Sequence, residues 1–550
     1  MNGAREWCFI AKSKWVSLAM LTVLLTLPFA EDVNAQAYTR DQLIEDAREL
    51  ARVIEETHPD PFVDCGGRIS FYRALQDVLE AVPSEGMTRD DFVRLLRPLI
   101  ALIGDAHTGI WGEYQVSNFF PGGVPLEFGV IEEDLYVTGV RSTADLDLLG
   151  ARLLSVEGVP LDELCERQHR VRATENRYSA LHLLAVNSLR YAEFMQDILP
   201  EWEDQKRVRL TVELSTGEVR DLAYTLPRSM GAMIRPETQV ELPASNEGGF
   251  VWSFWDDSQR TAYLRVDHML YYLEAYEIWD AAGSKNVTDE ELAAIPSATE
   301  AFRSLVVAME EAGTETLIVD LRRNEGGHSL MADILIYFLY GRDALVDVMK
   351  AGFDVGCGEI CRYSKLYFES CSNQTIDDFN EGRSVPMVVG DYDFSYYLTD
   401  PTAVAEVLAD PEPEFVTDWI DRSPTFYTEY LSGAYDGYYR PENVLVVSTS
   451  ETFSSGFTLA RHLYLVGATL VGTPSGQSSN CFGELTWFDL THTAIRIGVS
   501  ESCFIMFPED SELATVLPVH YPLTYEKLAS YDFDPNAWLR YALEIAETAE

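Results

Sequence analysis

From about residue 250 onward, apolar β-branched runs alternate with segments that carry apolar residues at helical spacing. The strand candidates are "TAYLRVDHM", "TETLIVDLRRNEGG" and "NVLVVSTSETF", and the helix candidates are "ATEAFRSLVVAMEEAG", "SLMADILIYFLYG" and "SGFTLARHLYLVG". This alternation predicts a mostly parallel sheet covered by helices. We therefore expect an α/β fold class, in a multi-domain chain because 550 residues exceed one ordinary core.

The remaining segments have different patterns. "RDQLIEDARELARVIEETHP" and "DDFVRLLRPLIALIGDAH" predict helices near the N-terminus, whereas short alternating strands predominate between about 120 and 228. Between about 343 and 440 the strand–helix alternation breaks down, which indicates an insertion. We therefore expect a helical domain at 36–118, a β-rich domain at 119–228, and a core at 229–550 that contains the insertion.

Residues 1–35 have the pattern of a signal peptide. A basic start precedes the apolar run "WVSLAMLTVLLTLPFA", and "VNAQA" offers small residues for cleavage after Ala35. A membrane anchor is the alternative, but the apolar run is short. We expect a periplasmic or secreted protein with no stable membrane span after cleavage.

Charge and cysteine content limit the partners. The formal net charge of −48 should repel nucleic acid and anionic membrane surfaces. In an oxidising compartment we expect a local disulfide among Cys357, Cys361 and Cys371 rather than a zinc site, because no histidine lies close to them in sequence. No metal or cofactor is expected, and the oligomeric state is left open.

The stretch "ETFSSGFTLARH" places Ser454 and Ser455 between a predicted strand and a predicted helix. Ser454 could simply cap the helix, or it could be a nucleophile near the positive end of the helix dipole. Gly326 and Gly327 follow another predicted strand, where they could form a tight turn or supply N–H groups to an oxyanion. The local pattern leaves both pairs of interpretations open, and it does not match the G-x-S-x-G elbow of α/β-hydrolases.

Four segments together resemble the S41 peptidases, the family of C-terminal processing proteases and the tricorn core. "TLIVDLRRNEGG" is similar to the family's D-L-R-x-N-x-G-G signature, and "TSETFSSGFTLARHLYLVGATLVGTPSG" resembles the segment of its nucleophilic serine. "LIGDAHTGI" resembles its D-x-H-T motif, and "ARLLSVEGVPLDEL" resembles the late part of a PDZ-like domain. The resemblance implies a ClpP/crotonase-like α/β core, an N-terminal helical domain and a PDZ-like β-rich domain.

The resemblance also implies site residues. Processing proteases activate the serine with a lysine, but Gln477 stands about where that lysine would fall. The chain is more similar to the branch that uses a histidine and a glutamate, which implies Ser454 as nucleophile, His107 as its base and Glu512 as the carboxylate that orients the histidine. The alternatives are a buried structural role for His107 and an acidic surface loop around Glu512.

The resemblance implies an oxyanion hole formed by backbone N–H groups of Ser455 and of Gly326 or Gly327. His328, beside these glycines, is expected to line the cleft. Phe457 and Val519 depart from the family pattern, which often has Glu and Asp at these positions.

The predicted function is an exported serine endopeptidase that hydrolyses peptide bonds of polypeptides through an acyl-enzyme. A catalytically inactive relative that binds peptides is the alternative, and an α/β-hydrolase esterase is a distant third.

Overall fold

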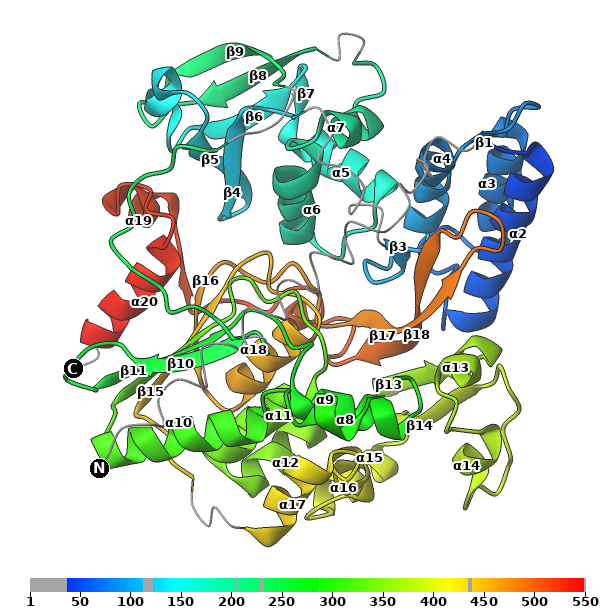
Figure 1. Cartoon of the computed structure of the whole chain (residues 1–550), viewed down its shortest axis with the longest axis vertical. Coiled ribbons are helices and arrows are strands. Elements are labelled where there is room, and N and C mark those ends of the chain that lie inside the picture. The colour runs from blue at the N-terminus through cyan, green and yellow to red at the C-terminus, as the bar shows by residue number, and fades with distance from the viewer. Residues whose placement is uncertain are drawn as a thin grey trace, which may run out of the picture.

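The computed structural model describes residues 37–111, 122–202, 206–227, 232–246, 248–285, 287–433 and 438–548. The predicted signal peptide at 1–35 lies outside the described residues. None of the helices in these ranges is both long and apolar enough to cross a bilayer. Helices and sheets are mixed, which agrees with the expected α/β multi-domain class (Figure 1).

A six-stranded sheet forms the centre of the C-terminal half, and five of its strands run parallel. Its strand order is β10 (Phe250–Phe254), β11 (Thr261–Val266), β12 (Thr316–Asp320), β15 (Asn443–Ser448), β16 (Thr469–Gly472) and β19 (Tyr521–Pro522). The strand before the glycine pair, β12, is therefore hydrogen-bonded to β15, the strand before the serine pair. The sequence predicted a mostly parallel sheet with both segments as strands, and this prediction is confirmed.

Helices cover both faces of this sheet, which explains its unbroken apolar strands. Leu317 and Val319 of β12 lie in the cluster with the helices of one face, whereas Ile318 lies in the cluster with the C-terminal helix of the other. The helices of the first face are α8 (Leu273–Ala281), α10 (Ala298–Ala312), α11 (Leu330–Tyr340), α12 (Arg342–Lys350) and α18 (Ser455–Leu465); the C-terminal helix is α20 (Ala537–Thr548). Two further short helices of the C-terminal half are α9 (Asp289–Leu292) and α19 (Tyr525–Ser530).

The region from 343 to 440 contributes both strands and helices. Its strands β13 (Cys357–Arg362) and β14 (Tyr392–Leu398) extend a second, antiparallel sheet formed with the long hairpin of β17 (Cys481–Asp489) and β18 (Arg496–Ile505). After α12, the helices of this region are α13 (Lys365–Ser370), α14 (Ile376–Asn380), α15 (Pro401–Ala409), α16 (Glu414–Ile420) and α17 (Pro424–Ser432). The segment that the sequence predicted as an insertion thus contributes two strands to this second sheet.

The middle segment, residues 122–227, has a sheet and an apolar cluster of its own. Its strands are β4 (Leu126–Ile131), β5 (Asp134–Val140), β6 (Arg152–Val156), β7 (Val159–Pro160), β8 (Arg207–Glu213) and β9 (Val219–Thr225), with helices α5 (Leu161–Val171), α6 (Arg177–Leu183) and α7 (Ala192–Ile198). In Figure 1 this sheet lies above the central one, with α6 between them.

The N-terminal helices pack against the long hairpin of the second sheet (Figure 1). These helices are α2 (Arg40–Thr57), α3 (Arg68–Ala81) and α4 (Arg89–Ala101), and a small two-stranded sheet of β1 (Ala37–Tyr38) and β2 (Met87–Thr88) joins their ends. Ile497 and Val499 of β18 are fully buried in the same cluster as Leu50 of α2 and Leu96 of α4. After α4, the strand β3 (Gly109–Trp111) pairs with β18, so the chain that leaves these helices is fixed to the hairpin.

The expected local disulfide is not formed, because all seven described cysteines are free thiols. Cys357 and Cys361 lie on the same strand, β13. Four residue-to-residue steps along an extended strand place their Cα atoms about 13 Å apart, well beyond the span of a disulfide. Cys371 lies at the end of helix α13.

Because the N-terminal helices and the β18 hairpin share one apolar cluster, truncating it should weaken both. We expect Ile497→Ala to lower the free energy of unfolding by about 3 kcal/mol, because the cavity would lie at a fully buried position. Hydrogen exchange should show reduced protection in α2–α4 and in β17–β18 together. The control Ile69→Ala, at a side chain that is 79% exposed, should change stability by less than about 0.5 kcal/mol. Loss of protection in the hairpin alone would contradict a shared core.

Candidate active site

Ser454 occupies the turn between β15 and α18 in a backbone conformation that is rare for residues other than glycine. Its φ is 52° and its ψ is −129°. It holds the N-cap position of α18, yet its side chain makes no capping hydrogen bond. A plain N-cap adopts an extended backbone and accepts from the first helical turn. The structure therefore excludes the simple capping role. Among the described residues the Ser454 hydroxyl has no hydrogen-bond partner, and it lies on a strained strand-to-helix turn.

Gly326 allows the chain after β12 to approach this serine closely. A Cβ atom at Gly326 would lie 2.5 Å from the Ser454 Cβ and 3.0 Å from the Ser455 backbone nitrogen. The φ of Gly326 is 108° and that of Gly327 is 144°, both disfavoured for other residues. A Cβ at Gly327 would lie 2.0 Å from the Met269 carbonyl oxygen. Both glycines are thus needed for close backbone approach.

The predicted oxyanion-hole N–H groups differ in whether they already donate a hydrogen bond within the protein. The N–H of Gly326 donates to Asn324 Oδ1 at 2.9 Å, so it is already engaged. No acceptor is assigned to the Gly327 N–H among the described residues. Ser455 is the first residue of α18, where the N–H groups have no preceding helical carbonyl to accept them. Gly327 and Ser455 are therefore the better pair of candidate donors.

Gln477, at the position predicted for the dyad lysine, does contact the serine: its Oε1 accepts from the Ser454 N–H. Its own backbone N–H donates to Ser475 Oγ at 2.9 Å, which helps to hold it in place. A carboxamide has no basic lone pair comparable to an amine, so Gln477 braces the turn but cannot deprotonate the serine.

His107 lies in a turn that is organised around the carboxylate of Asp105. Asp105 Oδ1 accepts from the His107 N–H at 2.8 Å, and its Oδ2 accepts from the Thr108 N–H at 3.0 Å and from Ser500 Oγ at 2.6 Å. His58 Nε2 lies 3.3 Å from the same Oδ2. Asp105 is 1% exposed. These bonds anchor the His107 turn to Ser500, and hence to β18.

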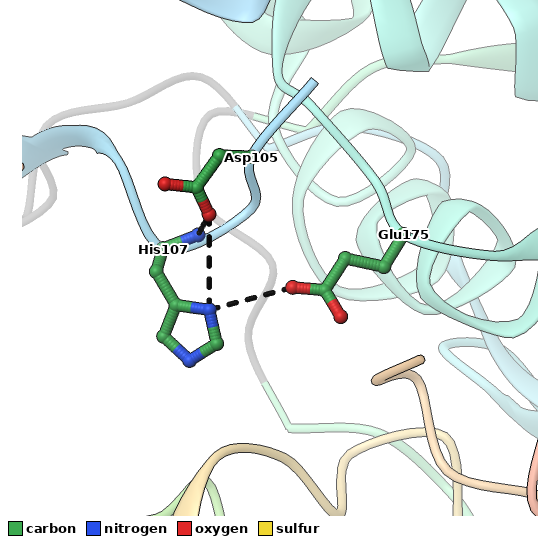
Figure 2. A group of neighbouring side chains, drawn as sticks. All are labelled: Asp105, His107 and Glu175. Carbon is green, nitrogen blue, oxygen red and sulfur yellow. Dashed lines mark hydrogen bonds and ion pairs between the residues drawn. The ribbon is translucent and has the colours of Figure 1, made fainter. Parts of the chain in front are cut away.

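Figure 2 shows Nδ1 of His107 directed toward Asp105 and Glu175, while the other ring nitrogen points away from both. Nδ1 lies 3.4 Å from Glu175 Oε1 and 3.8 Å from Asp105 Oδ1. The ring packs against Phe453, the residue before Ser454, with ring centroids 4.8 Å apart. The structure thus brings His107 and the Ser454 turn into one site, although no hydrogen bond joins the two side chains within the described residues.

The charges at this site oppose the effect of burial. Burial alone would lower the pKa of His107, but the contact with Glu175 and the charge of Asp105 outweigh it and raise the pKa above its usual value. Burial raises the pKa of Glu175, and its contact with His107 opposes that rise only in part. For Asp105, burial is outweighed by its contact with His58, by nearby histidine charge and by the Ser500 bond, so its pKa falls well below its usual range.

Asp105, His107 and Glu175 could also be read as metal ligands, because their ligand atoms lie within 4.8 Å of one another. Both oxygens of Asp105, however, already accept N–H or O–H bonds from the protein. This arrangement favours Asp105 as an internal brace for the turn over a role in coordination.

The remaining predicted residues lie as follows. Glu512 is exposed at the start of a short 3-10 helix (Glu512–Ala514) beside the exposed Glu509 and Asp510, and it is not among the carboxylates that contact His107. His328 stacks on Trp419, with centroids 5.4 Å apart. Phe457 is fully buried in the main apolar cluster, which gives a packing reason for its departure from the family pattern.

Sequence reasoning missed Glu175. It directly precedes Asn176, which caps α6, and an acidic residue at such a place normally indicates a helix start. No local signal marks it as a partner of His107, which lies 68 positions earlier in the chain. Only the docking of the middle segment brings the two together.

No protein-family profile and no curated protein sequence matches this chain. Its structure is similar to that of mature CPAF complexed with lactacystin, at 14% identity and a TM-score of 0.48, over 92% of this chain and 99% of that one. A second mature CPAF structure gives 13% identity and the same TM-score over 92% and 98%. The photosystem II D1 C-terminal processing protease is similar at 13% identity and a TM-score of 0.36, over 89% and 95%. These structural neighbours belong to the S41 family that the sequence motifs resemble.

The strain at Ser454 is measurable. We expect Ser454→Gly to raise the free energy of unfolding by about 1 kcal/mol, because relief of strain (about 1–3 kcal/mol) exceeds the entropy that glycine adds to the unfolded chain (about 0.4–1 kcal/mol). Denaturant unfolding of the two proteins measures this difference. Ser455→Gly, at a buried helical position, should instead be destabilising. A destabilised Ser454→Gly variant would show that the turn is not strained.

Proposed function

We propose that this protein is a serine peptidase that cleaves polypeptides through an acyl-enzyme, with Ser454 as nucleophile and His107 as general base. The observation that carries the proposal is the conformation of Ser454. Its hydroxyl is released from capping on a strained turn, directly against the backbone of Gly326. Such strain persists only where the surrounding structure holds it, and it concentrates at active sites.

The reaction follows from the arrangement of groups. Ser454 Oγ attacks the substrate carbonyl carbon, and its proton passes to the Nε2 atom of His107. The resulting oxyanion is stabilised by the N–H groups of Gly327 and Ser455, each contributing about 3–4 kcal/mol in typical cases. The imidazolium then protonates the leaving amine as the C–N bond breaks. Water, deprotonated by His107, hydrolyses the acyl-enzyme and regenerates Ser454.

The proposal includes export to the periplasm or the medium, which rests on the predicted signal peptide at 1–35. The N-terminal sequence of the protein recovered from those fractions tests this part, and it should begin at Gln36.

A fluorophosphonate probe and a quenched peptide library test the chemistry. The wild-type protein should be labelled at Ser454 and should cleave peptides, and Ser454→Ala should abolish both. His107→Ala should lower kcat by about 10³-fold or more without loss of fold, because the serine then lacks its base. Ser432→Ala, a change in helix α17, serves as the control and should keep full activity. A folded wild-type protein that is neither labelled nor active would overturn the proposal in favour of a peptide-binding relative.

A further inference from the structure

We infer that Glu175, supplied by the middle segment, is the carboxylate that positions His107. This inference rests on the proposed function and extends it, since the resemblance to the S41 peptidases implied Glu512 for that role. It assigns to Glu175 an indirect part in the reaction, because it contacts the base and not the reacting atoms.

The first argument is that two buried polar atoms lie close together and lack hydrogen-bond partners, so each could satisfy the other. His107 Nδ1 and Glu175 Oε1 are both buried, and neither has a hydrogen-bond partner among the described residues. They lie 3.4 Å apart, on side chains that are 9% and 6% exposed. An unpaired buried polar atom destabilises a protein, so a modest closure of this gap would satisfy both atoms at once.

The second argument is that the competing carboxylate is committed elsewhere. Asp105 Oδ1 lies farther from Nδ1, at 3.8 Å, and already accepts the His107 N–H. Its Oδ2 accepts hydrogen bonds from the Thr108 N–H and from Ser500 Oγ. Asp105 therefore fixes the backbone of the turn, whereas Glu175 is free to fix the ring.

The third argument is that Glu175 is itself held in place. Its Oε2 accepts from the Ser478 N–H at 2.9 Å, and its backbone carbonyl accepts from Ser478 Oγ at 3.0 Å. The next residue, Asn176, donates through Nδ2 to the Ser475 carbonyl at 3.2 Å. These bonds dock the start of α6 on the loop that carries Gln477, the residue that contacts Ser454.

The chemical consequence concerns the tautomer of His107. A carboxylate at Nδ1 holds a proton on that nitrogen, which leaves Nε2 with the lone pair that accepts the serine proton. In Figure 2 the second ring nitrogen faces away from Glu175, as this role requires. The middle segment thereby completes the active site, because base and orienting carboxylate come from different parts of the chain.

Glu175→Gln tests the inference, because a glutamine keeps the size of the side chain and can still accept from Ser478. An amide facing Nδ1 can no longer hold a proton there, so we expect kcat to fall by about 10²–10⁴-fold. Loss of the negative charge should lower the pKa of His107, so the acid limb of the kcat/KM profile should move to lower pH. Glu175→Asp keeps the charge and should leave that limb near its wild-type position. Glu166→Gln, on an exposed pair with Arg170 of α5, is the matched control and should change neither quantity.

The charged groups that raise the pKa of His107 are Glu175, Asp105 and Glu484 of β17, and Glu484→Gln measures the contribution of Glu484. NMR titration of ¹³C-labelled histidine, assigned with His107→Gln, reads the pKa without requiring activity. An inactive wild-type protein whose His107 pKa still falls in Glu175→Gln would contradict the proposed function but support the pairing. An active wild-type protein whose His107 pKa and kcat are unchanged in Glu175→Gln would overturn the inference. A wild-type His107 titration that changes on addition of EDTA would also overturn it, in favour of a bound cation.

Discussion

The proposed site depends on the hydrogen bonds that the buried carboxylate of Asp105 accepts. This carboxylate gathers the backbone of the His107 turn and the side chain of Ser500 around one charge, at a position that is 1% exposed. Removing this carboxylate would leave each buried donor unsatisfied, at a typical cost of about 1–3 kcal/mol per group. The depressed pKa of Asp105 keeps the carboxylate charged, so its stabilising contribution is present at neutral pH and is lost as pH falls toward that depressed value.

The hydrogen bonds of Asp105 help to hold together two site residues that are far apart in the sequence. The serine belongs to the central parallel sheet, whereas the histidine follows the N-terminal helices, more than 300 residues earlier in the chain. Pairing of β3 with β18, together with the apolar cluster shared by the helices and the hairpin, fixes the N-terminal segment to the C-terminal half. The middle segment is then docked through the contacts of Glu175 and Asn176 with the loop at 475–478. Three distant parts of the chain thus converge beside Ser454.

Much of the architecture could be predicted because it is encoded locally. The strands β12 and β15 are apolar on both faces, and the glycine and serine turns that follow them must meet at one sheet edge. The position of Gln477 near the serine followed from the resemblance to the S41 peptidases, whose lysine falls at about that place.

What could not be predicted was the side-chain partner of His107. Glu175 and Glu512 look alike in sequence, as acidic residues beside helix starts, and only long-range docking places Glu175 at the ring while Glu512 remains exposed. The disulfide expectation was wrong for a related reason, since the cysteine spacing does not reveal that Cys357 and Cys361 share one extended strand.

The central claim is that Ser454, His107 and the two backbone donors act on one substrate carbonyl. A crystal structure of the protein after reaction with an aryl phosphonate tests it most directly, because the tetrahedral adduct mimics the intermediate of acyl transfer. The account predicts phosphorus bonded to Ser454 Oγ, a phosphonyl oxygen within about 3 Å of the N–H groups of Gly327 and Ser455, and His107 Nε2 beside the adduct. An adduct on another residue, or a phosphonyl oxygen that faces away from both N–H groups, would contradict it.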